Sequence, residues 1–335
     1  MDTPVLITHK TAWLVHHAPQ DLVQAIAQHD YQIGARGLST QQRTTRIRRA
    51  LTDCGIPTSM LEAIDISVVF AFERIRAKGV NCHVLGQNLP YGHIDELTPG
   101  IFITDEALTF VFAAEWMDRI EYLEYGYEVC GDYRMGLNPG DSYTEQPATT
   151  SKDEVVELLD RHPGKPGATR ARLALRHVYD HSASPMESAS AIALSLPTRE
   201  GGVGIRGVEL NKPLEIPKRL WHCTKARTLK IDALITCKRR ELGIEYKGGF
   251  HDEAERKGAD AEREAVLAQM GYRIVTLTST QFASQLAFHR AMNNIREALG
   301  TPRCIDAVYQ RKQDELRKVL IRNWKSDQAE EPPSE

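Results

Sequence analysis

The stretch "LKIDALITCKRRELGIEYKGG", residues 229–249, contains two apolar segments in which polar residues alternate, joined by a basic turn. Alternation with a period of two is typical of β-strands that bury one face. The segments on either side of "KRR" are therefore predicted to pair as an antiparallel hairpin. Glu245 and Lys247 then share one face of the second strand, and Asp232 is the lone acid of the first. Pairing of the two strands predicts that the carboxylates of Asp232 and Glu245 converge.

The segments that follow this hairpin extend the same fold. A helical pattern covers residues 252–271, a strand pattern covers residues 272–278, and a second helical pattern covers residues 280–300. A helix that connects two strands of one sheet places those strands parallel to each other. The second half of the chain is therefore predicted to be α/β in the α+β sense, with a mixed sheet.

Helical patterns dominate the first half, and the longest covers residues 105–131. Short strand patterns occur in "VNCHVLG" (residues 80–86) and "GIFITD" (residues 100–105). Residues 133–153 are polar and rich in Gly, Pro, Ser and Thr, which is typical of a linker. These patterns predict a mostly helical region over residues 1–150 and a second domain over residues 151–322. Residues 323–335 are predicted to be a charged tail without fixed structure.

The composition is that of an ordinary globular protein. The chain has 335 residues, of which 41% are hydrophobic and 26% are charged, and its net charge is −3. No apolar run reaches the roughly 18 residues that a membrane span requires, and the N-terminus lacks the pattern of a secretory signal. We therefore expect a cytoplasmic protein without a membrane partner. The six cysteines show no CxxC spacing and are expected to be reduced thiols.

The acids and bases near the hairpin indicate metal and phosphate chemistry. Two facing carboxylates repel each other unless a cation lies between them, and Mg²⁺ prefers such oxygen ligands. Glu187 adds a third acid at the start of a helix that Ser184 is predicted to cap. Residues 211–240 hold nine Lys and Arg against two acids, which suits a phosphodiester beside a metal site. A solvated strand face with basic turn residues would produce the same pattern, and this alternative stays open.

These residues resemble the PD-(D/E)XK nuclease superfamily, whose members have a restriction-endonuclease-like core. The superfamily places an acid on a helix, an Asp on a strand and E-x-K on the next strand. Glu187, Asp232 and the triplet Glu245-Tyr246-Lys247 match this order, and Ile231 stands where the superfamily has its proline.

A closer resemblance covers residues 170–300, which are similar to uncharacterised bacterial endonuclease-like domains related to very-short-patch repair endonucleases. The matching segments are "SPMESASAIALSLP", "KIDALI", "GIEYKGGFH" and "GADAEREAVLAQMGYRIVTLT". The resemblance implies that His251 assists metal-water chemistry, and that Asp260 and Arg263 form a D-x-x-R motif. The segments "ITHKTAWLVHH" and "YEVCGDYR" resemble the helical regions that precede such domains in abortive-infection-type antitoxins and regulators.

The expected function is therefore a Mg²⁺- or Mn²⁺-dependent endonuclease of defence, repair or mobile-element biology. Asp232 and Glu245 would bind the metal, Glu187 would complete its shell, and Lys247 would position the water. His251 would act as general base or acid. Asp260 and Arg263 would support His251 without touching the metal, or would simply pair with each other as helix neighbours.

Nucleic acid is the expected partner, with DNA preferred and RNA left open, and a homodimer is also left open. The basic residues considered for contacts with phosphates are Lys225, Arg227, Lys230, Arg239, Arg240, Arg43 and Arg46. The alternative function is a non-catalytic DNA-binding antitoxin or transcriptional regulator that keeps a nuclease-like fold.

Overall fold

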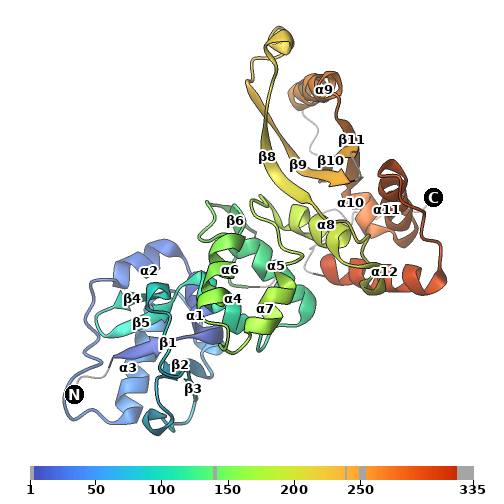
Figure 1. Cartoon of the computed structure of the whole chain (residues 1–335). Helices are drawn as coiled ribbons and strands as arrows, with labels where there is room; N and C mark the ends of the chain where they lie inside the picture. Colours follow the sequence, from blue (N-terminus) through green and yellow to red (C-terminus); the bar gives the residue numbers. More distant parts are fainter. Residues whose placement is uncertain (1–3, 139–141, 238–239, 249–253, 323–335) are drawn as a thin grey trace, which may run out of the picture. The chain divides into compact units, whose positions relative to one another are not determined.

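The computed structural model of the chain describes residues 4–138, 142–237, 240–248 and 254–322, with the backbone alone for residues 254–260. The chain divides into two compact units (Figure 1). Unit 1 comprises Met1–Val129 and Arg134–Arg176, and unit 2 comprises Cys130–Tyr133 and His177–Glu335. The main division thus falls near residue 176 and not at residue 150. The predicted tail, residues 323–335, lies outside the described residues.

Unit 1 contains a five-stranded mixed sheet with the strand order β3-β2-β1-β5-β4. The central strand β1 runs parallel to β5 and antiparallel to β2, and β2 runs parallel to β3. The prediction of a mostly helical N-terminal region therefore needs correction, although it included two of these strands. The strands are β1 (Val5–Ile7), β2 (Ile64–Val68), β3 (Val80–Val84), β4 (Ile94–Thr98) and β5 (Ile101–Thr104).

Helices pack around this sheet to form the core of unit 1, in which Ile7, Ile64 and Ile101 have no exposed surface. The helices α6 and α7, predicted to belong to the second domain, pack against α4 instead. The helices of unit 1 are α1 (His9–His16), α2 (Gln20–Ile26), α3 (Thr40–Asp53), α4 (Glu106–Ala113), α5 (Arg119–Val129), α6 (Lys152–Arg161) and α7 (Ala168–Ala174).

The single long helix predicted over residues 105–131 is interrupted at Asp118. The Asp118 carboxylate accepts hydrogen bonds from the backbone N–H groups of Ile120 and Glu121, at 2.8 and 2.9 Å. Glu121 accepts in return from the backbone N–H of Asp118 at 3.2 Å. Such reciprocal capping satisfies the free N–H groups of a new helix start. The chain therefore forms α4 and α5 as two helices.

Unit 2 contains a four-stranded mixed sheet with the order β11-β10-β9-β8. The hairpin β9–β10 is antiparallel, and α9 connects β10 to the parallel strand β11, as the sequence predicted. The structure adds β8 at the edge beside β9. The strands are β8 (Val208–Glu215), β9 (Thr228–Cys237), β10 (Arg240–Lys247) and β11 (Arg273–Thr278), and the helices are α8 (Pro185–Ser195), α9 (Ala254–Gln269), α10 (Ser279–Ala283), α11 (Gln285–Ala298) and α12 (Ala307–Leu320).

Local sequence explains how unit 2 positions its polar residues. Ser184 accepts a hydrogen bond from the backbone N–H of Glu187 and so caps α8, as predicted. The helix α8 contacts both β9 and β10, which brings its first turn toward the hairpin. On the hairpin, Ile231 and Leu234 pack with Leu267 of α9 in one buried cluster. Burial of such side chains contributes about 1.5–3 kcal/mol each and fixes α9 against the sheet.

The remaining elements are short. A two-stranded ladder pairs β6 (Tyr133–Arg134) with β7 (Thr144–Glu145). Single 3₁₀ turns occur at Thr58–Met60, Ala71–Glu73, Tyr91–His93, Thr198–Glu200 and Lys218–Leu220. Among the described helices, none combines the length and the apolar character that crossing a bilayer requires.

Candidate active site

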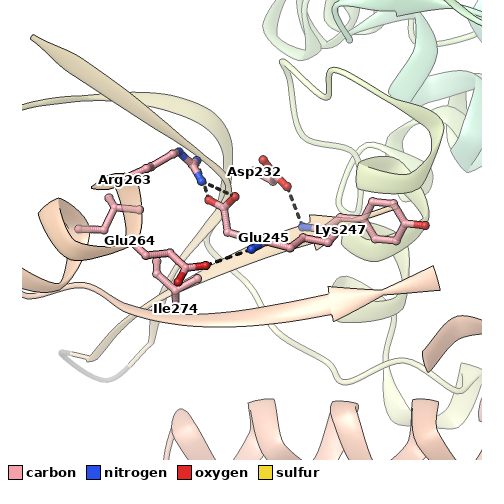
Figure 2. Close-up of a pocket in the computed structure, with 8 residues that line it drawn as sticks. Asp232, Glu245, Lys247, Arg263, Glu264 and Ile274 are labelled. Carbon is pink, nitrogen blue, oxygen red and sulfur yellow. Dashed lines mark hydrogen bonds and ion pairs between the residues drawn. The ribbon is translucent and has the colours of Figure 1, made fainter. Parts of the chain in front are cut away.

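The β9–β10 hairpin separates at the residues predicted to carry the chemistry. The last paired residues of the ladder are Ala233 and Ile244. The following residues, Asp232 and Glu245, would face each other if the pairing continued. Instead, the Asp232 carboxylate accepts a hydrogen bond from the backbone N–H of Tyr246 at 2.7 Å. A side chain thus replaces a backbone partner, and the hairpin holds both carboxylates at the point where its strands part (Figure 2).

Glu245 is buried, with 7% of its surface exposed, and Arg263 of α9 pairs with it. The two guanidinium nitrogens donate to the two carboxylate oxygens at 2.7 and 2.8 Å, and Arg263 also donates to the carbonyl of Lys230. This bidentate geometry is the strong form of an ion pair. The sequence predicted that Arg263 supports His251 or pairs with Asp260. The structure pairs its guanidinium with Glu245, and the predicted partners, His251 and the side chain of Asp260, lie outside the described residues.

The carboxylates of the site share an excess of negative charge. Burial and the nearby Glu245 raise the pKa of Asp232 from 3.8 to about 7, with a smaller contribution from Glu187. Burial also raises the pKa of Glu187, and the charge of Glu245 adds to this effect. Arg263 is the cation that offsets part of this charge. The three predicted acids therefore interact electrostatically, although they come from three different elements.

Asn211 binds one of these acids, Glu187, and was not singled out from the sequence. Its side-chain amide donates to Glu187 at 2.5 Å, and Glu187 also accepts from the backbone of Ala183 and the hydroxyl of Ser184, at 2.9 and 3.1 Å. Asn211 falls opposite Asp232 in the β8–β9 register and has a φ of +47°. A left-handed residue inside a strand is rare, and Asn tolerates it better than most. The isolated Asn within the strand pattern was the available signal.

Lys247 reaches into the same cavity, which has a volume of about 310 Å³. Its ammonium group lies 3.0 Å from the carboxylate of Glu264, and both side chains are about half exposed. Glu264 follows Arg263 on α9 and was also missed from the sequence, because a charged helix residue carries no sign of what it faces. The residues lining the cavity are Asp232, Glu245, Tyr246, Lys247, Arg263, Glu264, Leu267 and Ile274 (Figure 2).

The carboxylate oxygens do not form a closed metal shell in this arrangement. Glu187, Asp232 and Glu245 are not among the groups of three whose ligand atoms all lie within 4.8 Å of one another. In the part of the chain that the structure describes, one such group exists, and it lies in unit 1. The donor chemistry nevertheless fits a hard divalent ion, because the oxygens are carboxylates and their charge exceeds that of Arg263. Arg263 already binds both oxygens of Glu245, so an ion at this carboxylate would use their remaining lone pairs or displace the guanidinium.

Three of the predicted site residues cannot be placed. His251 and Arg239 lie outside the described residues, and the side chain of Asp260 is also outside them. The predicted roles of these residues stay predictions.

Among the basic residues, Arg227 lies on an exposed surface of unit 2. Its guanidinium stacks over the ring of Trp221, 4.6 Å from the ring centre, and 41% of Trp221 is exposed. Lys225 and Lys230 are also exposed. Stacked Arg and Trp side chains offer both charge and an aromatic face to a nucleic acid.

Two other basic residues have structural partners. Arg240 donates to the carbonyl of Ala298 at 3.2 Å, near the end of α11. Arg46 donates to the carbonyl of Gln32 at 2.5 Å, and Arg43 on the same helix is half-buried. Each of these bonds uses one of the five N–H groups of a guanidinium, so the phosphate contacts of Arg240 and Arg46 stay predictions.

Comparison of the chain with protein-family models, with curated proteins and with solved structures finds no match. The chemistry of the chain's own side chains is therefore the basis for assigning a function.

Proposed function

We propose that unit 2 is a divalent-metal-dependent nuclease with a restriction-endonuclease-like core, and that it hydrolyses phosphodiester bonds of DNA. One observation carries the proposal. Asp232 and Glu245 lie at the opening of one hairpin and line one cavity with Lys247, and burial together with the nearby charge of Glu245 raises the pKa of Asp232. Buried like charges in a cavity are typical of functional sites.

The carboxylates of the site are the type of ligand that Mg²⁺ and Mn²⁺ prefer. Asp232 and Glu245 would hold the ion, and Glu187 would contribute through its negative charge from the start of α8. The bound ion would supply an activated water and would stabilise charge on the phosphate. Lys247 would position the water or offset charge on the phosphate, because it lines the same cavity as the two acids.

Arg263 has a place in the same proposal. When Glu245 turns to the metal, the N–H groups that Arg263 donates to it would face the substrate. A guanidinium binds a phosphate with the same bidentate geometry that it uses for a carboxylate. Binding of metal and substrate would then replace the Arg263–Glu245 ion pair with two others, Glu245 with the metal and Arg263 with the phosphate.

A nicking assay tests this proposal. Full-length protein is incubated with supercoiled plasmid and Mg²⁺ or Mn²⁺, beside the variants Asp232→Asn and Glu245→Gln. Glu241→Gln serves as the matched control, because Glu241 is an exposed acid on the same strand. We expect nicking by the wild type and the control, and no activity above the metal-free level in the two site variants. If the wild type, both site variants and the control nick the plasmid equally well, the cleavage comes from a contaminant.

A second candidate is a non-catalytic DNA-binding regulator, and the Arg263–Glu245 pair favours it. A buried carboxylate that already has a bidentate counter-ion does not need a metal. This candidate predicts retention of DNA in gel shifts with EDTA, no cleavage with either metal, and unchanged retention in Glu245→Gln.

A further inference from the structure

A second polar cluster lies in unit 1, and the proposed nuclease makes no use of it. It consists of His9, His83 and Glu115, whose ligand atoms all lie within 4.8 Å of one another. His9 is the first residue of α1, His83 lies in β3, and Glu115 follows α4. The fold of unit 1 thus brings together three metal-ligating side chains from segments that are far apart in the sequence.

Hydrogen bonds leave Nδ1 of His83 available as a ligand, and Nε2 of His9 is available when its Nδ1 donates to Thr8. The Nε2 of His83 lies 3.0 Å from a carboxylate oxygen of Asp65. A carboxylate only accepts, so Nε2 carries the hydrogen and Nδ1 keeps its lone pair. The Nδ1 of His9 lies 2.8 Å from the hydroxyl of Thr8, and its Nε2 lies 3.6 Å from Glu115. Histidines that bind metals almost always donate their second N–H to such an oxygen.

The partner of His83 is itself fixed. Asp65 lies in β2 with 8% of its surface exposed. One of its oxygens accepts from His83 at 3.0 Å and from Asn81 at 3.1 Å, while the other lies 3.4 Å from the hydroxyl of Thr11. The carboxylate is therefore held by groups from both neighbouring elements, β3 and α1. A buried acid that orients a histidine is the usual support of a metal ligand.

The two rings are stacked, with their centres 3.6 Å apart and their planes inclined by 12°. A metal lies near the ring plane of each histidine that binds it, so one ring must turn out of the stack. His83 has room to turn about its bond to Asp65, because β3 is an edge strand and 29% of its side chain is exposed. His9 is held by α1 and by Phe112, which stacks on it with 4.5 Å between the ring centres.

The geometry points to a binding site for a transition-metal ion, Zn²⁺ in particular, formed by His9, His83 and Glu115. Two imidazole nitrogens and one carboxylate oxygen suit Zn²⁺ and not Mg²⁺, which prefers oxygen ligands alone. Three protein ligands leave one tetrahedral position for a water molecule or for a group from another molecule.

Zinc titration of the full chain tests this site. The protein carries Asp232→Asn and Glu245→Gln so that the acids of unit 2 do not contribute, is stripped with EDTA and is titrated with ZnCl₂ by calorimetry. We expect one Zn²⁺ per chain. His83→Gln and Glu115→Gln, added to this background, should weaken binding by ~100-fold or more, because removal of even the outer partners of metal ligands costs about 10–100-fold. Asp65→Asn should weaken it by about 10–100-fold.

Controls separate loss of the ligand from loss of the fold. His29→Gln removes an exposed histidine of the same unit and should leave zinc affinity unchanged. Glu115 is 39% exposed at its side chain, so Glu115→Gln should keep the unfolding temperature of its background in EDTA. The inference is overturned if the background protein takes up no zinc, or if zinc binds equally well to His83→Gln and Glu115→Gln. These outcomes are independent of whether unit 2 cleaves DNA.

Discussion

Replacing Arg263 by Gln tests the electrostatics of the unit 2 site directly. In the wild type, Arg263 neutralises Glu245, which is 7% exposed and which raises the pKa of Asp232. The variant removes the cation and leaves the buried carboxylate with its negative neighbours. We therefore expect Arg263→Gln to destabilise the protein in EDTA, and a divalent ion to reverse much of this loss.

The magnitude follows from the burial of the pair. Removing one partner of a buried ion pair costs about 3–5 kcal/mol, and the side chain of Arg263 is 30% exposed. We expect a cost near the lower limit, about 3 kcal/mol, which lowers the unfolding temperature by about 6–12 °C in a domain of this size. Arg303→Gln is the matched control, because Arg303 pairs with Glu297 on the surface, where both side chains are about 60% exposed. Such a pair contributes about 0–1 kcal/mol.

Thermal unfolding followed by circular dichroism, with EDTA or with Mg²⁺, measures both effects. A ligand that binds only the folded state stabilises it in proportion to the logarithm of its concentration over its dissociation constant. Mg²⁺ should therefore raise the unfolding temperature of Arg263→Gln more than that of the wild type. If Arg263→Gln lowers the free energy of unfolding by no more than Arg303→Gln does, the Arg263–Glu245 pair is not the buried contact described above. If Mg²⁺ leaves the variant unchanged, the carboxylates are not metal ligands.

Three further outcomes are expected. The pKa of Asp232 in the folded protein, about 7, exceeds its ordinary 3.8, so the folded state holds more protons between these values and loses stability as the pH rises through them. Asp232→Asn should therefore be more stable than the wild type at pH 8 in EDTA by urea unfolding, and a lower stability there would contradict the assigned burial. Asn211→Ala should cost about 2–3 kcal/mol, since it removes the donor to Glu187 and puts Ala at positive φ. Asn211→Gly should destabilise the protein by about 1 kcal/mol less than Asn211→Ala, because Gly adopts a positive φ without strain. Equal losses of stability would show that the backbone conformation at this position contributes nothing. In gel shifts, Arg227→Gln should weaken the affinity for DNA and reduce the dependence of that affinity on salt. Arg240→Gln should leave the affinity unchanged and lower the unfolding temperature in a thermal melt. If Arg240→Gln weakens DNA binding and Arg227→Gln does not, the two residues have the opposite roles.

The sequence determined the hairpin and its crossover because these features depend on local periodicity. Alternation in residues 229–249 predicted the antiparallel pair, and the helix that follows predicted the parallel strand β11. The register of a hairpin also brought Asp232 and Glu245 to neighbouring positions. The capping of α8 by Ser184 was visible for the same reason, since it involves only a few consecutive residues.

The sheet of unit 1 could not be predicted in the same way. Its central strand β1 has three residues, which is too short for alternation to be recognised, and long-range pairing with β2 and β5 creates it. The division of the chain near residue 176 likewise depends on α6 and α7 packing against α4. The polar segment near residue 150 carried a composition signal but no information about these contacts.

The sequence by itself determined which residue types are present at the candidate site, and the tertiary structure decided which charges meet. Arg263 is 18 residues from Glu245, and only the packing of α9 on the sheet joins them. Asn211 reaches Glu187 because β8 pairs with β9, and His9, His83 and Glu115 meet because three separate elements of unit 1 converge. Periodicity specifies the face on which a side chain lies, whereas the partner on that face is set by contacts between distant segments, which no local pattern encodes.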